Sequence, residues 1–245
     1  MFQGPIDYSI VKKAIDKKQV EINLVNIRDF GKDRHKQVDD TPYGGGTGMI
    51  LRVDVLCGAI TNTKRSYSSS EAKRESRSGS RQARTINKNQ KVVLLSASGK
   101  KFTQQKAQEF AKVDHLILVC GHYEGVDGRI KKYIDEEISI GDFITTGGEI
   151  PSMLIIDCVI RLLPGIFKEG VTENESFSLT DEKKGKYLEY PQYTKPAIFD
   201  NLAVPEVLLS GNHKRIQEWR TEQALEKTKK FRPDLLNLSL RRNPS

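Results

Sequence analysis

The sequence predicts an α/β fold built on a parallel sheet, and three observations lead to this prediction. Three continuous apolar runs, KVVLLSASG (91–99), HLILVCG (115–121) and EEISIGDFITTGG (136–148), each end in Gly or in Gly and Ser. A segment that suits a helix, 103–112, separates the first two runs. Continuous apolar strands that alternate with helices are typical of a parallel sheet covered on both faces. Ligands of such sheets bind beyond the carboxyl ends of the strands, where these glycines and serines lie.

The segment before these runs is expected to hold two helices, a strand and a loop. Residues 8–18 place their apolar side chains on one side, as an amphipathic helix does. EINLVNI (21–27) has the composition of a strand. The stretch 33–49 contains too much Gly, Asp and Pro for regular structure and is predicted to be a loop, and 49–60 is predicted to be a helix.

The segment 61–91 differs in composition from the rest of the chain. It contains seven serines, nine lysines and arginines, two glutamates and almost nothing apolar, and it carries seven of the eight net positive charges. A segment with so little to bury cannot offset its ordering entropy, so we expect a disordered insertion. Two roles stay open: a solvated loop, and an electrostatic arm that adds non-specific RNA affinity.

A helix, an irregular stretch and a helical domain are expected to follow the third apolar run. Proline at the first turn suits a helix over 151–163. Only Asp157 and Arg161 interrupt its apolar surface after that turn, which indicates burial against the sheet or against a second subunit. Residues 164–196 are polar and irregular, and 204–236 are predicted to form a small helical domain.

The composition excludes several classes of protein. No apolar run is long enough to span a bilayer, and the N-terminal MFQGPIDYSI lacks the pattern of a signal peptide. Cys57, Cys120 and Cys158 lack metal-ligand spacing and lie among apolar residues, which favours three reduced thiols and no metal site. The expectation is a cytoplasmic protein with no membrane attachment.

Two glycine-dense loops, GHYEGVDG (121–128) and SIGDFITTGGEIP (139–151), are the first candidates for a ligand site. Such loops let a ligand approach backbone N–H and C=O groups closely. Neither is followed by the GK[ST] of a phosphate-binding loop, and neither has the setting of a G-x-G-x-x-G dinucleotide site. Taken alone, they are explained more simply as tight turns between strands.

Six motifs that occur in one chain give these loops more weight. In chain order they are HKQVDDTPYGGGTGM, LVCGHYEGVDGRI, DEEISIGDFITTGGEIP, CVIRLLPGIF, YPQYTKP and VPEVLLSGNHKRIQEWR. Together they closely resemble the bacterial tRNA (guanine-N1)-methyltransferase family, TrmD, of the SPOUT class. The resemblance covers nearly the whole chain apart from residues 61–91, and several of the motifs exceed ten residues.

The resemblance implies an α/β domain with a C-terminal trefoil knot, plus a small C-terminal helical domain. It divides the chain into a SAM-binding SPOUT domain (1–165), an interdomain linker (166–195) and a helical tRNA-binding domain (196–245). It further implies a homodimer with the active site at the subunit interface. The activity would be methyl transfer from S-adenosylmethionine (SAM) to N1 of guanosine 37 of tRNA, where another guanosine precedes it, and the family often uses Mg²⁺ to assist the chemistry.

Transferred by motif, the contacts to SAM come from the ends of the three apolar runs and the start of the following helix. They are Leu95, Ser96, Gly121, Tyr123, Gly125, Ser139, Ile140, Gly141, Phe143, Ile144, Gly147, Gly148 and Pro151.

Methyl transfer to N1 of guanine requires two further groups. A carboxylate must remove the N1 proton, and the negative charge that then develops on the base needs a cationic or hydrogen-bonding partner. Arg161 matches the family's arginine for the second role, with a salt bridge to Asp157 as the structural alternative. Glu124 matches a position that touches the target guanine, with a solvated loop carboxylate as the alternative. His213 and Arg215 lie in the motif of the tRNA-binding helix and are assigned to the substrate.

The sequence departs from the family's pattern at the general base. The family typically has Asp-Ser-Phe in the linker, whereas this chain has Glu175-Ser176-Phe177. Glutamate carries the same carboxylate on a stem one methylene longer, and the linker before it is one residue shorter. We therefore predict Glu175 as the base, with Glu173 as the next candidate because Asn174 cannot accept the proton.

A second departure lies at the start of the sequence. Family members usually begin with a short β-strand before a Phe-Pro-x-Met-Phe segment, and this sequence starts at Met1-Phe2. The expectation from this comparison is that one strand of the sheet is missing.

Two other functions stay open at this point. A non-catalytic RNA-binding protein would account for both departures, but it would not need cofactor loops. A SPOUT methyltransferase with another RNA target would share the loops, but the SGNHKRIQEWR motif matches this family's tRNA-binding domain.

Overall fold

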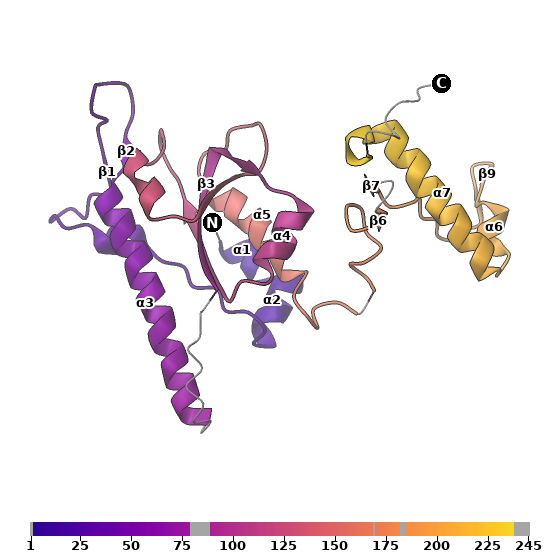
Figure 1. The fold of residues 1–245 in the computed structure, drawn as a ribbon, viewed down its shortest axis with the longest axis horizontal. Helices are drawn as coiled ribbons and strands as arrows, with labels where there is room; N and C mark the ends of the chain where they lie inside the picture. The colour runs from indigo at the N-terminus through magenta and orange to yellow at the C-terminus, as the bar shows by residue number, and fades with distance from the viewer. Residues whose placement is uncertain (1, 79–88, 169, 182–184, 238–245) are drawn as a thin grey trace. The chain divides into compact units, whose positions relative to one another are not determined.

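The computed structural model describes residues 2–78, 89–168, 170–181 and 185–237. The chain divides into two compact units, Met1–Ile166 and Phe167–Ser245 (Figure 1).

The first unit is built on a parallel sheet of three strands in the order β4-β3-β5. The strands are β3 (Gln90–Lys101), β4 (His115–Cys120) and β5 (Glu136–Ser139). Leu95 of β3 is paired with Cys120, the last residue of β4, and with Ile138 near the end of β5. After an irregularity between Leu95 and Lys100, β3 continues to Lys101 and pairs again with the end of β5. The predicted α/β class and parallel sheet are confirmed.

Helices cover both faces of this sheet, as predicted. In β3, Val92 and Leu94 pack in one core cluster with α3 (Val53–Ser78), whereas Val93 and Leu95 pack in a second cluster. The second cluster includes residues of α4 (Gln104–Phe110) and α5 (Glu149–Ile160). Alternate residues of a strand point to opposite faces, so one central strand anchors both layers.

The N-terminal segment forms helices but not the predicted strand. The helix predicted at 8–18 is present as α2 (Ser9–Asp16), preceded by α1 (Gln3–Ile6). The strand predicted at 21–27 is wrong: the chain runs without ladder pairing into the 3-10 helix η1 (Ile27–Phe30), and Leu24 is 60% exposed. A strand needs a neighbouring edge for its backbone groups, and no described strand pairs with this segment.

The loop predicted at 33–49 is largely present, with β1 (Asp39–Asp40) paired to β2 (Ile50–Leu51) across it. The next helix, α3, starts at Val53 and continues to Ser78, well beyond the predicted end at residue 60. The prediction of disorder over 61–91 is therefore wrong for residues 61–78, and also for Gln90 and Lys91, which begin β3. Residues 79–88 lie outside the described residues.

The burial of its first turns explains why α3 extends so far. Val55, Leu56 and Ile60 are buried in the core, which fixes the start of the helix. Extending a helix is easier than nucleating one, and the Ala, Glu, Lys and Arg residues that follow are good helix formers.

The second unit packs a long helix against an extended segment. α7 (His213–Phe231) contributes Ala224 to a small core with Tyr187 and Leu236. The helix begins where the Gly-Asn pair predicted it, because the Asn212 side chain accepts a hydrogen bond from the backbone N–H of Arg215 at 3.2 Å. The remaining elements of this unit are β6 (Thr180–Asp181), β7 (Gly185–Lys186), β8 (Ile198–Phe199), β9 (Leu202–Ala203), α6 (Glu206–Leu209) and the 3-10 helix η3 (Pro233–Leu235).

Part of the segment predicted as a linker is anchored to α7. The buried Thr228 hydroxyl accepts a hydrogen bond from the backbone N–H of Leu188 at 2.8 Å. Lys227 donates to the backbone carbonyl of Glu189 at 3.0 Å. Residues 187–190 are thus held within the second unit.

The described helices and the three cysteines bear on the composition-based expectations. None of the described helices is both long enough and apolar enough to cross a membrane. Cys57, Cys120 and Cys158 are all free thiols.

Candidate functional site

The ends of β4 and β5, Leu95 of β3 and the start of α5 meet at one edge of the sheet. The backbone N–H of Gly148, at the start of α5, donates to the carbonyl of Gly121, just after β4, at 2.8 Å. A Cβ on Gly148 would lie 2.6 Å from the Cα of Cys120, so a side chain there would collide with backbone. Glycine is therefore required for the helix to begin against the strand, and the thirteen predicted SAM contacts all belong to the segments that meet here.

The loop that follows β5 is held by its own hydrogen bonds. The buried Ser139 hydroxyl donates to the carbonyl of Gly141 at 3.0 Å and accepts from the N–H of the same residue at 3.2 Å. Thr145 donates to the carbonyl of Gly147 at 2.9 Å. Gly141 has a φ of +152°, a value that side chains disfavour. The loop presents backbone groups in a fixed arrangement.

A side-chain pair that was not among the predicted site residues joins the two glycine-dense loops. His122 Nε2 lies 2.8 Å from Glu149 Oε1. Gly147 leaves room for this contact, because a Cβ there would lie 2.5 Å from the Glu149 carboxylate and 2.8 Å from His122 Nε2. The available signal was a histidine in one loop and a glutamate in the other.

A third glycine-rich loop, 44–48, also reaches this edge. The backbone N–H of Glu124 donates to the carbonyl of Met49 at 3.1 Å, and the N–H of Leu51 donates to the carbonyl of Gly125 at 3.0 Å. Gly48 has a φ of +90°, and a Cβ there would lie 2.4 Å from Cγ of Glu124. The Glu124 side chain thus lies against the glycine run of the HKQVDDTPYGGGTGM motif.

Several apolar side chains around these loops are open to solvent. Phe143 is 58% and Ile144 is 84% exposed, and Ile150 and Leu154 on the outer face of α5 are 51% and 42% exposed. The edge therefore combines backbone polar groups with uncovered apolar surface. Burial raises the pKa of the neighbouring Cys120 thiol to about 11, which leaves that thiol protonated and inert near neutral pH.

Arg161 lies at the opposite end of α5 from the glycine loops. It caps the C-terminus of the helix, and its backbone N–H donates to the carbonyl of Asp157. At 1.5 Å per residue, Glu149 and Arg161 are separated by about 18 Å along the helix axis. Within one chain, the structure does not bring Arg161 to the start of α5.

Glu175 belongs to the second unit, in a turn that its neighbours hold in place. The backbone N–H of Phe177 donates to the carbonyl of Tyr187 at 2.9 Å, and Ser176 Oγ accepts from the N–H of Glu189 at 2.9 Å. Phe177 has a φ of +71°. Glu175 is half-buried, whereas Glu173 is exposed.

His213 and Arg215 lie in the first turn of α7 and are exposed. The start of a helix carries partial positive charge and unpaired N–H groups, which favour a phosphate ligand. Among the described residues, no three His, Cys, Asp or Glu side chains are placed to hold a metal ion.

Comparison with known proteins identifies the family. The tRNA (Guanine-1)-methyltransferase TrmD family matches residues 1–238. The chain belongs to the TrmD family. It is 47% identical over 237 residues to the tRNA (guanine-N(1)-)-methyltransferase of Dictyoglomus turgidum, covering 96% of this chain and 85% of that protein. Proteins of the same name from Metamycoplasma arthritidis (49% identical; 96% and 90% covered) and Geobacillus kaustophilus (45%; 97% and 87%) match in the same way.

Proposed function

We propose that this protein transfers a methyl group from SAM to N1 of a guanosine in tRNA, and that the guanosine is residue 37. The observation that carries the proposal is membership of the TrmD family over residues 1–238, in a chain that keeps both glycine-dense loops. The two alternatives, an RNA-binding protein without catalysis and a methyltransferase with another RNA target, are outcomes of the experiment below.

The edge of the sheet fits SAM. Its glycines leave backbone N–H and C=O groups accessible to the polar parts of a ligand, and Tyr123, Phe143 and Ile144 offer exposed apolar surface to an adenosine. We assign the thirteen residues between Leu95 and Pro151 named above to this ligand. When bound, SAM supplies an activated methyl group on a sulfonium.

Glu175 is the proposed general base that takes the N1 proton. Two hydrogen bonds at Ser176 and Phe177 anchor the turn that carries it, as a catalytic carboxylate requires. The competing carboxylate, Glu173, is exposed in the same turn. Proton removal converts N1 into a nucleophile, and the developing negative charge is placed opposite Arg161.

The site is proposed to lie at the interface of a homodimer. The separation of about 18 Å between the two ends of α5 supports this, since Arg161 of a second copy could reach loops that its own chain places far from it. Ile150 and Leu154, four residues apart on one face of α5, together with Ile144 form the exposed apolar surface that such a dimer would cover. Co-expressing Arg161→Gln and Gly148→Ala chains tests the arrangement, because only a shared site restores one intact site per mixed dimer.

The second unit is the proposed tRNA-binding part. His213 and Arg215 at the start of α7 suit phosphates, and Glu124 beside the glycine run 44–48 is assigned to the target guanine. We propose the division into a SPOUT domain (1–165), a linker (166–195) and a helical domain (196–245), in which residues 187–190 of the linker are anchored to α7. Family membership likewise supports a trefoil knot in the first domain and a cytoplasmic location. Assistance by Mg²⁺ stays a prediction.

Methyl transfer from labelled SAM to tRNA transcripts tests the proposal. We expect label in a transcript with guanosine 37 preceded by guanosine, and none after guanosine 37 is replaced by adenosine. Transfer that ignores the replacement would assign another RNA target. RNA binding without any transfer would assign a non-catalytic binder.

A further inference from the structure

The second unit contains a hollow of about 470 Å³ that none of the roles above uses. The segment from Tyr190 to Ala197 forms one wall, and α6 and α7 form the other. Its volume lies within the range of about 300–1,000 Å³ typical of small-ligand pockets. Apart from its aromatic rings, the apolar part of the lining is Pro191, Ala197, Val204, Leu208, Leu209 and Ile216.

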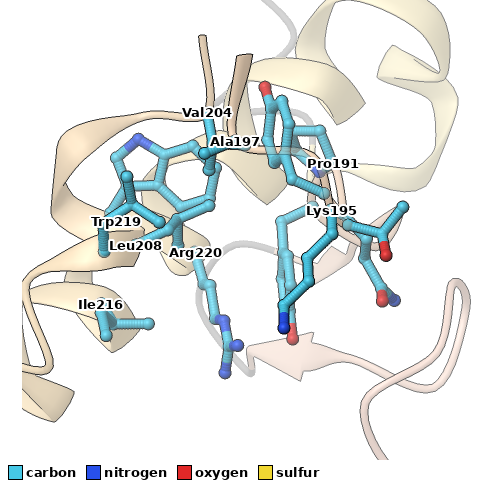
Figure 2. A pocket seen from close by; sticks show the side chains of 13 residues that line it. Pro191, Lys195, Ala197, Val204, Leu208, Ile216, Trp219 and Arg220 are labelled. Atoms are coloured by element: carbon cyan, nitrogen blue, oxygen red, sulfur yellow. The ribbon is translucent and has the colours of Figure 1, made fainter. Parts of the chain in front are cut away.

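Aromatic rings and cations line the hollow together. Trp219 and Tyr193 have ring centroids 6.3 Å apart at an angle of 52°, and Tyr193 is half exposed. The Arg220 guanidinium stacks over the Tyr190 ring at 4.9 Å. In Figure 2, Trp219 lies on the apolar side, while the charged ends of Lys195 and Arg220 point to the same side of the view.

The charges of the hollow are not balanced by its own lining. Lys195 and Arg220 are its only ionisable groups apart from the two tyrosines, and no carboxylate lines it. Within the described ranges, Arg220 Nε is buried and has no hydrogen-bond partner. Two cations in a lining without a carboxylate favour an anionic ligand, and a guanidinium suits phosphate in particular.

We propose that this hollow binds one unstacked base of an RNA strand, with the adjoining phosphate at Arg220 and Lys195. Single-stranded bases stack on aromatic side chains and on arginine, while basic residues follow the backbone. This inference rests on the proposed function, because it takes the RNA strand to be part of the tRNA substrate. The base in question is a second one, separate from the guanine assigned to the first unit.

Trp219 allows a direct test because it is the only tryptophan in the chain. We expect unstructured single-stranded RNA to quench its fluorescence, and an abasic oligomer of equal length to leave it nearly unchanged. Inorganic phosphate should have no effect, and guanosine monophosphate should act only at far higher concentration than RNA. Equal quenching by the abasic oligomer, or tighter binding of the free nucleotide, would overturn the proposal.

Variants separate stacking from charge. Tyr193→Leu should weaken RNA binding, followed by anisotropy of labelled RNA, about tenfold or more because one stacking face is lost. Arg220→Gln should make the dependence of log affinity on log salt less steep by about 0.7, as expected for one lost phosphate contact on a single strand.

Two further variants serve as controls. Trp219→Phe keeps an aromatic ring and should lose the fluorescence signal while retaining most of the RNA affinity. Lys229→Gln removes the same charge from α7 outside the hollow and should leave the quenching intact.

Two outcomes distinguish this proposal from the proposed function. If methyl transfer to tRNA occurs but saturating RNA leaves Trp219 fluorescence unchanged, only the base-binding hollow is wrong. If RNA quenches Trp219 in a base-dependent way but no transfer occurs, the hollow is supported and the proposed activity fails. Full RNA affinity in Tyr193→Leu would also overturn the hollow.

Discussion

The two units build their candidate sites from different parts of the chain. In the first unit, glycines bring backbone segments within contact distance, and the loops are held by backbone hydrogen bonds such as that from Gly148 to Gly121. In the second unit, the candidate groups are side chains: Glu175 in an anchored turn, and the aromatic and cationic lining of the hollow. We therefore expect that adding a side-chain atom at a glycine weakens ligand binding in the first unit. In the second unit, we expect that removing a side-chain functional group lowers activity or RNA binding.

The largest effect is expected from removing the carboxylate in the second unit. Glu175→Gln should lower kcat for tRNA methylation by about 10²–10⁴-fold, the range for a lost general base. SAM affinity, measured by calorimetry, should stay unchanged because the cofactor residues belong to the first unit. Glu173→Gln, in the same turn, is the matched control and should keep most of the activity. Full activity of Glu175→Gln would contradict the assignment of Glu175 as the general base.

The next effect is expected from adding one methyl group in the first unit. Gly148→Ala forces a Cβ to within 2.6 Å of the Cα of Cys120, and overpacking of this kind costs about 1–3 kcal/mol. We expect SAM affinity to fall more than tenfold and Tm to fall with it. Gly128→Ala, in the other loop, meets open space and should change neither. Normal SAM binding by Gly148→Ala would show that the backbone at this edge of the sheet can shift to accept a Cβ, contrary to the prediction.

A smaller effect is expected where α7 holds the extended segment. Thr228→Val keeps the side-chain shape but leaves the N–H of Leu188 without its acceptor, which should cost about 1–3 kcal/mol of unfolding free energy. Trp219 fluorescence in a denaturant titration reports this unit specifically. Thr221→Val makes the same change on the exposed side of α7 and should be nearly neutral. Equal stability of the two variants would mean that the segment is not held by Thr228.

The smallest effect is expected at the side-chain contact between the two glycine loops. Glu149→Gln weakens the 2.8 Å interaction with His122 without changing side-chain size, so SAM affinity should fall about two- to tenfold. Glu206→Gln changes the corresponding acid in the first turn of α6 and should leave SAM affinity unchanged. A loss as large as that of Gly148→Ala would mean that side chains, and not only backbone, shape the cofactor loops.

The sequence predicted the sheet better than the segments around it. Continuous apolar runs identify buried parallel strands because both faces of such strands are covered, and β3, β4 and β5 followed that pattern. The strand predicted for residues 21–27 is not formed, because strand pairing depends on a neighbouring edge that local sequence does not reveal. Residues 61–78 were predicted to be disordered but are helical. This polar segment continues a helix whose first turns are fixed by the core.

By itself, the sequence determined the α/β class, the family, the candidate cofactor loops and the start of α7, since each depends on local patterns or on matched motifs. Only the tertiary structure brought His122 to Glu149, placed Gly48 against Glu124, and gathered Tyr193, Trp219 and Arg220 around one hollow. These contacts join residues from separate segments or successive elements, and their distances follow from how strands and helices pack. The glycines could be read from the sequence because backbone freedom is a local property, but what each glycine makes room for is decided by the fold.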